Sequence, residues 1–216
     1  MIDFSKKEKS LFKRLNTPAK IQSYLNSFPF NFEEDDRDTI RSPLTAIRFG
    51  KIHCFEGALL GAYILSLHGY RPSLLHLKAK KNDFDHVIVL FKKDGFFGAL
   101  SKTNHYCLRY RDPVYKTVRE LVMSNFHEYF LNKDGTKTLR SYSKPLPMSR
   151  VKINWVTSKD DLWVIDEMLD ALPHYDILSK KQIASLRTVD IIERKAGNLV
   201  EYTPENVSFT DRNLSA

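Results

Sequence analysis

Cys54 and His86 are the two residues of this sequence whose types and order could support nucleophilic chemistry. Cys54 opens a long apolar run, and His86 opens a later run rich in β-branched residues. Unpaired backbone N–H groups and the macrodipole at a helix N-terminus favour an anion over a neutral thiol. A cationic partner beside such a thiol lowers its pKa from about 8.5 into the range of roughly 3.5 to 7.5. The pattern therefore predicts a thiolate and imidazolium pair.

A buried helix is expected directly after Cys54. The small residues Gly57 and Gly61 stand at helical spacing within the apolar run, so neighbouring backbone can approach the helix closely on that side. Gly69 is typical of the residue that ends such a helix. The sequence therefore places Cys54 at the start of a helix that lies inside the core.

An antiparallel sheet is expected to follow this helix. Residues 74–78 and 86–91 are predicted strands, and the turn pair Asp94-Gly95 predicts a hairpin into a third strand at 96–101. The local topology is thus one helix followed by antiparallel strands.

The flanking regions are predicted to be largely helical. Ser5 to Glu8 has the form of a capping box, and Thr17-Pro18 offers an N-cap with proline at the first helical position. Further helices are expected over 117–130 and 158–172, the latter capped by Ser158. Residues 108–116 are expected to form a loop, and the chain beyond residue 195 a polar, loosely ordered tail.

Composition limits the class of protein. The chain has 216 residues, 42% of them hydrophobic, so we expect one domain with extensions. Lys and Arg outnumber Asp and Glu by 34 to 26, and the net charge of +8 favours acidic partners, although no compact basic patch stands out. Two cysteines, no basic-then-apolar leader and no apolar run of about 20 residues predict a soluble cytoplasmic protein without a membrane partner.

Three segments resemble the transglutaminase-like branch of the papain fold. They are residues 50–58 around Cys54, residues 85–91 around His86, and residues 94–101 of the predicted hairpin. Residues 17–22 and 109–115 also resemble an uncharacterised bacterial group within that superfamily. The resemblance implies an α+β fold in which the Cys-bearing helix packs on an antiparallel sheet. The implied organisation is a helical lead (1–41), a transglutaminase-like core (42–131), a C-terminal helical extension (132–194) and a polar tail (195–216).

The same resemblance implies roles for individual residues. Cys54 is the nucleophile, and His86 acts as its general base and later as general acid. Where the superfamily usually has an aspartate, this chain has Ser101, with Asn104 three residues further on. A hydroxyl or an amide can orient the imidazole, but neither stabilises imidazolium by charge as a carboxylate does. Asp85 is adjacent to His86, but successive side chains of a strand face opposite ways.

Other residues near these positions are candidates for substrate binding. His53 and Glu56 flank Cys54, and the cations and aromatic ring of Arg109, Tyr110 and Arg111 could select an anionic substrate at a cleft rim. The alternative for this stretch is a solvated loop whose arginines pair with Asp112 or Glu120, and we do not expect nucleic-acid binding.

Structural and metal-binding interpretations compete with catalysis. A free cysteine is often a small core residue, and a lone histidine in a sheet is more often hydrogen-bonded than catalytic. The spacing of the potential zinc ligands is poor, so no metal or cofactor is expected. Those potential ligands are His53, Cys54, His86, His105 and Cys107.

Two functions from different classes remain open. The first is a cysteine-dependent hydrolase or acyltransferase that acts on an amide or thioester, in the manner of a protease, amidase or transglutaminase, with a peptide or protein substrate. The second is a catalytically silent papain-fold module that binds a peptide or another macromolecule. A low pKa of Cys54 favours the first, and an inert buried thiol favours the second.

Overall fold

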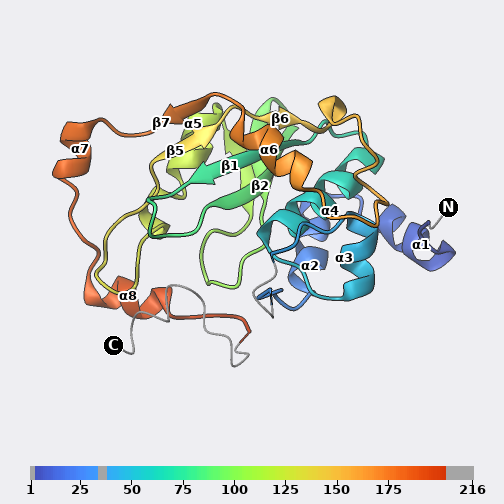
Figure 1. Cartoon of the computed structure of the whole chain (residues 1–216), viewed down its shortest axis with the longest axis horizontal. Coiled ribbons are helices and arrows are strands. Elements are labelled where there is room, and N and C mark those ends of the chain that lie inside the picture. The colour runs from blue at the N-terminus through green and yellow to red at the C-terminus, as the bar shows by residue number, and fades with distance from the viewer. Residues whose placement is uncertain (1–2, 34–37, 203–216) are drawn as a thin grey trace.

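The structure, a computed structural model, describes residues 3–33 and 38–202 and shows an α+β arrangement (Figure 1). The helices are α1 (Lys6–Arg14), α2 (Pro18–Asn26), α3 (Pro43–Phe49), α4 (Cys54–Leu67), α5 (Val118–Met123), α6 (Trp163–Asp170), α7 (Lys180–Ala184) and α8 (Ile191–Gly197). The strands are β1 (Ser73–Lys78), β2 (His86–Lys93), β3 (Phe96–Leu100), β4 (Arg111–Tyr115), β5 (Ser141–Ser143), β6 (Leu146–Pro147) and β7 (His174–Asp176). Short 3₁₀ helices lie at Phe126–Glu128 and Met148–Arg150.

The strands form one antiparallel sheet. Its order is β4-β3-β2-β1-β5-β7, and β6 also pairs with β1. The hairpin between β2 and β3 turns at Asp94 and Gly95, whose φ angles of 52° and 87° both lie in the left-handed region. Two positive φ angles match the twist of the flanking strands, which is why an Asp-Gly pair fits this turn.

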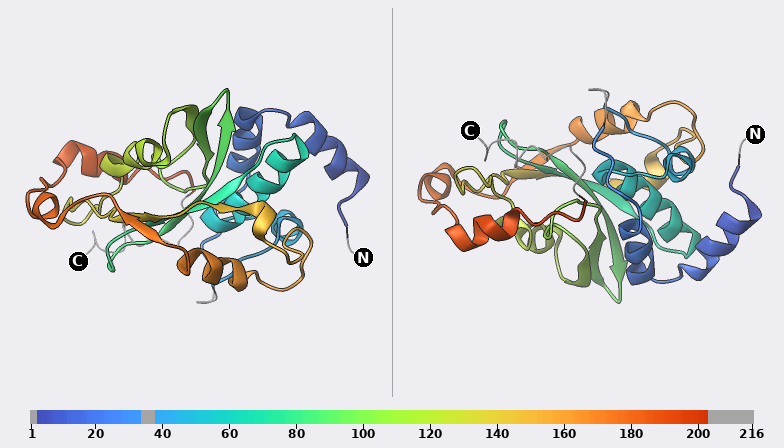
Figure 2. Two further views of the ribbon diagram at one scale, coloured as in Figure 1. Left: turned by 90° about the horizontal axis from the view of Figure 1, so that it is seen from above. Right: turned by 90° about the horizontal axis from the view of Figure 1, so that it is seen from below.

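Alternating side chains of the central strands build two cores on opposite faces of the sheet. Val87 and Val89 of β2 face the core that contains α4 and α6, whereas Ile88 and Leu90 face the core that contains α5. Seen edge-on, α5 and α6 lie on opposite sides of the sheet (Figure 2). Because β1 and β2 are covered on both faces, residues 74–77 and 86–91 are buried in succession rather than at alternate positions.

Helix α4 is the buried helix that the sequence predicts. Ten of its 14 residues are buried, and a capping box joins His53, the N-cap, to Glu56 in the first turn. A Cβ added at Gly57 would lie 2.5 Å from Cβ of Lys102, so glycine is needed for this close approach. The helix ends at Leu67, just before Gly69 with φ +80°.

The N-terminal lead packs directly on the core. Helix α1 has the expected capping box from Ser5 to Glu8, and Thr17 caps α2 with Pro18 at the first helical position. Ile21 and Leu25 of α2 are fully buried in the same core as α4. Residues 3–26 are therefore part of the globular unit rather than an appendage.

Several expectations about the flanks were wrong. The helix expected over 117–130 is divided into α5 and a 3₁₀ turn, and the helix expected over 158–172 begins only at Trp163, because Ser158 forms a local turn with Asp160. Part of the loop expected at 108–116 is strand β4.

The segment from 132 to 194 is also not purely helical. It supplies β5, β6 and β7, which extend the sheet beyond β1. Of the expected polar tail, residues up to 202 are described, and Val200 forms an antiparallel bridge with His105. The rest of that tail lies outside the described residues.

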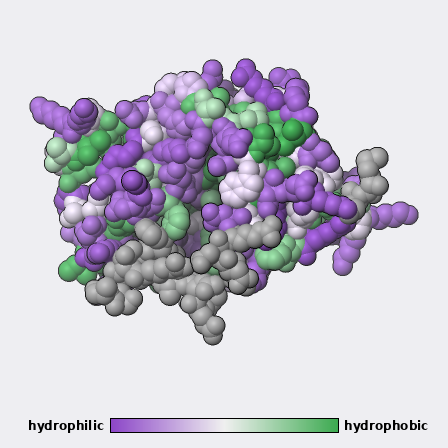
Figure 3. Space-filling model, viewed as in Figure 1, coloured by the Kyte–Doolittle hydropathy of each residue, from purple (hydrophilic) through white to green (hydrophobic). Residues whose placement is uncertain are grey.

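None of the helices in the described ranges is long and apolar enough to cross a lipid bilayer. Hydrophilic side chains cover most of the face visible in Figure 3, with the apolar residues in separate small groups.

Candidate active site

Cys54 is the first residue of α4, and its side chain lies between two imidazoles. It is partly exposed and hydrogen-bonds to both His53 and His86. The first amides of a helix have no intrahelical partner, so this end of α4 also presents N–H groups and positive potential. Cys54 therefore lies where an anionic sulfur is favoured by backbone and side chains together.

These contacts lower the pKa of the Cys54 thiol. Burial raises the pKa, but the hydrogen bonds from His53 and His86 and the positive charge of their rings outweigh it, so the pKa lies well below its ordinary value. Cys107 shows the opposite behaviour, since burial raises its pKa to about 12, with the nearby Glu128 carboxylate adding to the effect. Only the first of these two thiols has the character of a nucleophile at neutral pH.

Ser101 fixes the orientation of the His86 ring. Its Oγ lies 2.7 Å from His86 Nε2 and donates to the carbonyl oxygen of Leu108 at 2.6 Å. Because the hydroxyl proton is used in the second bond, Oγ accepts the Nε2 proton of His86. The other ring nitrogen, Nδ1, is then left to face the Cys54 sulfur.

The backbone of Ser101 is held by the side chain of Gln22 from helix α2. The Gln22 amide donates to the carbonyl oxygen of Ser101 at 2.7 Å and accepts from its N–H at 3.0 Å. All of these groups are buried. The lead helix thus positions the residue that orients the imidazole.

The Leu108 carbonyl is held by an unusual backbone conformation. Leu108 has φ 56°, in the left-handed region that branched side chains rarely adopt. Its N–H donates to Glu128 Oε2 at 2.9 Å, and the same oxygen is paired with Arg111 at 2.5 Å. The contacts of Leu108 with Glu128, and of Glu128 with Arg111, therefore fix the carbonyl oxygen that accepts the Ser101 hydroxyl proton.

His53 is a second imidazole next to the sulfur rather than a substrate contact. Its Nε2 lies 2.7 Å from the carbonyl oxygen of Thr39, and in the neutral ring Nδ1 accepts the N–H of Phe55 at 3.2 Å. Burial lowers its pKa, but the bond to Cys54 and the charge of Glu56 outweigh burial and raise the pKa to about 9. His53 therefore adds a positive charge beside the sulfur near neutral pH.

Glu56 is also not available to a substrate, contrary to expectation. Its side chain is fully buried and accepts hydrogen bonds from a ring of donors, so it stabilises the start of α4 and the chain that precedes it. These donors are the N–H groups of His53 and Arg41 and the side chains of Asn31, Thr39 and Arg41.

Asn104 does not reach His86, which corrects the second candidate for the third position. Its amide donates to the carbonyl oxygen of Tyr202 at 3.1 Å and its oxygen accepts from the Tyr202 N–H at 2.9 Å. Asp85 faces away from His86, as strand alternation predicts, and its carboxylate lies 3.3 Å from His76. Of the three polar candidates, Ser101 alone contacts the His86 ring.

The basic segment is occupied by internal contacts rather than free to bind a substrate. Arg109 pairs with Glu201, and Arg111 pairs with Glu128 instead of the expected Asp112 or Glu120. The ring of Tyr110 stacks near Phe91, with centroids 6.3 Å apart. The expectation that these three residues form a cleft rim therefore finds no support in their contacts.

Lys102 is a buried residue near the site that the sequence did not single out. Its ammonium donates to the carbonyl oxygen of Phe28 at 2.6 Å, and its side chain is fully buried against Gly57. Burial lowers its pKa to about 8, although Glu201 favours the charge. The only signal in the sequence was a lysine directly after a buried strand.

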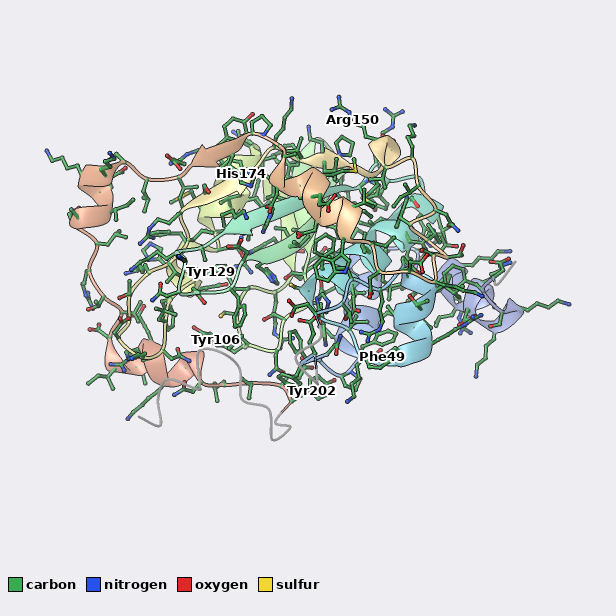
Figure 4. The ribbon with its side chains drawn as sticks, in the orientation of Figure 1. Phe49, Tyr106, Tyr129, Arg150, His174 and Tyr202 are labelled. Carbon is green, nitrogen blue, oxygen red and sulfur yellow. The ribbon has the colours of Figure 1, made fainter. Side chains whose placement is uncertain are left out.

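A small cavity of about 50 Å³ adjoins Leu108, with the buried ring of Tyr129, labelled in Figure 4, in its wall. A wider groove of about 760 Å³ lies between the loop after α4 and strands β2 and β3. Cys54 is not among the described residues that line these two spaces. Cys54 as a whole residue is neither fully buried nor exposed.

Fold and site together define an α+β protein with a hydrogen-bonded Cys–His–Ser arrangement at the N-terminus of a buried helix. No family model matches the chain, and no curated protein matches it.

Proposed function

We propose that this protein is a cysteine-dependent hydrolase or acyltransferase of the papain fold, in its transglutaminase-like branch, acting on an amide or thioester. One observation carries the proposal: Cys54 lies at a helix N-terminus between two imidazoles, and its pKa is lowered well below the ordinary value. A structural core thiol has no need of such a setting, and its pKa is raised by burial, as for Cys107.

The first half of the reaction forms an acyl enzyme. The Cys54 thiolate attacks the carbonyl carbon, a carbon–sulfur bond forms, and negative charge moves to the carbonyl oxygen. The N–H of Cys54, in the first turn of α4, is placed to stabilise that oxyanion. Imidazolium His86 then gives its Nδ1 proton to the leaving amine or thiol as the bond to carbon breaks.

The second half releases the acyl group. Water, for hydrolysis, or an amine, for transfer, attacks the thioester carbon, and neutral His86 takes its proton. Cys54 leaves as thiolate, and the proton on His86 restores the ion pair. Throughout, Nε2 of His86 keeps its proton and donates it to the Ser101 hydroxyl oxygen, which keeps Nδ1 directed at the reacting atoms.

The direct test is detection of the acyl enzyme. The protein is mixed with short peptide thioesters and activated amides of acidic and neutral sequence, quenched in acid, and analysed by intact and peptide mass spectrometry. We expect an acyl adduct on Cys54 and turnover, both lost in Cys54→Ala, with Cys107→Ala as the matched control that keeps both. Turnover by Cys54→Ala equal to that of the wild type would contradict the proposal.

A binding module of the same fold is the second candidate. Two observations favour it: a neutral hydroxyl stands where the superfamily usually has a carboxylate, and Cys54 lies outside the cavities described above. Under this alternative Cys54 reacts with iodoacetamide but forms no acyl adduct with any substrate. Peptides then bind to Cys54→Ala with the same affinity as to the wild type.

A further inference from the structure

A second cluster of reactive side chains lies where α6 and β7 meet the sheet. His76 comes from the middle of β1, Asp170 is the last residue of α6, and His174 is the first residue of β7. One ligating atom from each lies within 4.8 Å of the others. Figure 4 labels His174 at this junction.

Two nitrogens of this cluster are buried without hydrogen-bond partners. They are Nδ1 of His76, a residue only 4% exposed, and Nε2 of His174. A buried polar atom without a partner is destabilising by roughly 1–3 kcal/mol, so two at one place require an explanation.

The second nitrogen of each ring shows where the protons are. His174 Nδ1 lies 2.9 Å from the carbonyl oxygen of Leu172, which can only accept, so Nδ1 carries the proton. His76 Nε2 lies 3.3 Å from the Asp85 carboxylate, which favours the proton on that nitrogen. The two unpartnered nitrogens are therefore free lone pairs, and both belong to the cluster with Asp170. Metal-binding histidines are commonly held in this way, by a carbonyl or a carboxylate on the other nitrogen.

The third group completes a set of ligands suited to a metal. Asp170 Oδ1 lies 3.4 Å from His76 Nδ1. Ligands at zinc distances of 2.0–2.1 Å in a tetrahedron are about 3.3 Å apart, so this pair is already at the required spacing. Asp170 is exposed at a helix end and can adjust its side chain toward His174.

Lys78 is the competing cation at this place. Its ammonium lies 2.8 Å from Asp170 and 3.2 Å from Asp85. When Asp170 binds a metal, Lys78 keeps its ion pair with Asp85. Its side chain is also partly exposed, so water can solvate the ammonium. The charge of Asp85 also offsets that of the incoming ion.

We propose that His76, Asp170 and His174 bind a divalent transition-metal ion of the zinc class, with water in the fourth position. Imidazole nitrogens and one carboxylate are typical ligands of such ions, whereas calcium and magnesium prefer oxygen ligands alone. The bound ion links α6 and the three-residue strand β7 to β1. The three ligands include none of Cys54, His86 and Ser101, so the proposal does not depend on the function proposed for Cys54.

Zinc titration of the metal-free protein tests the proposal. We expect one Zn²⁺ per chain by calorimetry, and a rise in Tm on adding Zn²⁺. Affinity falls at least about tenfold in Asp170→Asn and in His174→Ala, because each loses one ligand. Both residues are at the surface side of the cluster, so these variants fold even if changes at buried His76 do not. Cys54→Ser is the matched control, and it keeps binding and the Tm rise.

Cobalt distinguishes the ligand types. Co²⁺ at the proposed site gives visible d–d absorption without a sulfur-to-metal charge-transfer band, and Zn²⁺ displaces it. Binding that survives in Asp170→Asn and His174→Ala, binding lost in Cys54→Ser, or no binding by the wild type would each overturn the proposal.

Discussion

Ser101 lies 2.7 Å from His86 and accepts the ring proton because its own hydroxyl proton is given to a backbone carbonyl. A carboxylate at this position would face the Leu108 oxygen without a proton to share, and the two oxygens would repel. The serine hydroxyl therefore suits this position, because it can accept the imidazole proton and still donate its own proton to the Leu108 carbonyl.

Two substitutions at Ser101 test this relationship. Ser101→Ala removes the acceptor of the Nε2 proton, so we expect the alkylation rate of Cys54 at pH 7 to fall about tenfold. Ser101→Asp should also fail to raise the rate, because the buried carboxylate meets the Leu108 carbonyl. The measurement is iodoacetamide labelling read by peptide mass spectrometry. A faster rate in Ser101→Asp would show that the hydroxyl is only a weak substitute for a carboxylate.

The pH dependence of Cys54 labelling reports its pKa. Since the pKa is lowered, the thiolate persists as pH falls, and we expect fast labelling from pH 8 to below neutrality. His86→Gln and His53→Asn each remove a positive partner and shift the profile to higher pH, and Asn at 53 still caps the helix. Cys107, with a pKa of about 12, is the internal control and labels only at alkaline pH. Parallel profiles for both cysteines would contradict this prediction.

Gln22 is expected to matter for both stability and reactivity. Gln22→Ala leaves the buried N–H and carbonyl of Ser101 without partners, so we expect a loss of about 3 kcal/mol in the free energy of unfolding by urea. Because Ser101 would then no longer hold the His86 ring in place, Cys54 should also be labelled more slowly. Gln182→Ala, an exposed glutamine in the first turn of α7, is the matched control and should change the free energy of unfolding by about 1 kcal/mol or less.

Lys102 should make the stability of the protein depend on pH in the alkaline range. Its pKa is about 8 in the folded state and about 10.5 when unfolded, so between these values the unfolded chain binds more protons. Stability contributed by this group therefore rises as pH increases from about 8 to 10.5. Lys102→Met removes that rise. The difference in free energy of unfolding between the wild type and Lys102→Met should therefore change by about 2 kcal/mol between about pH 8 and 10.5. A constant difference would show that Lys102 titrates normally.

Removing the Glu56 carboxylate should be strongly destabilising. Glu56→Ala leaves partly buried Arg41 and four further donors without their acceptor, so we expect a loss of about 3 kcal/mol or more by urea unfolding. Glu167→Ala, on the exposed face of α6, should change stability by no more than about 0.5 kcal/mol. Equal effects of the two substitutions would show that the buried network contributes little.

Much of the core could be predicted because its signals are local. The apolar run after Cys54, the β-branched strands and the Asp94-Gly95 turn each specify one element, and their order gives a helix followed by antiparallel strands. The short strands β5 and β7 could not be found in this way, because three residues carry no periodicity and pair only through the tertiary structure.

The details of the site depend on contacts that sequence spacing does not encode. His53 and Glu56 flank Cys54 in the sequence, but cap geometry gives them a place beside the sulfur and inside the protein rather than toward a substrate. Asn104 is close to Ser101 along the chain, yet it binds Tyr202. The pairing of His76 with His174 joins distant segments and had no local signal.

The contact between Gln22 and Ser101 spans 79 positions of the chain. During folding it can form only after the lead helix, the buried helix and the central hairpin have come together, because closing so long a loop requires those elements first. Until that contact forms, the backbone of Ser101 is not held by Gln22, so the His86 ring lacks its fixed direction. Cys54 would then become a strong nucleophile only once the protein is folded. An unfolded molecule would expose a thiol of ordinary reactivity.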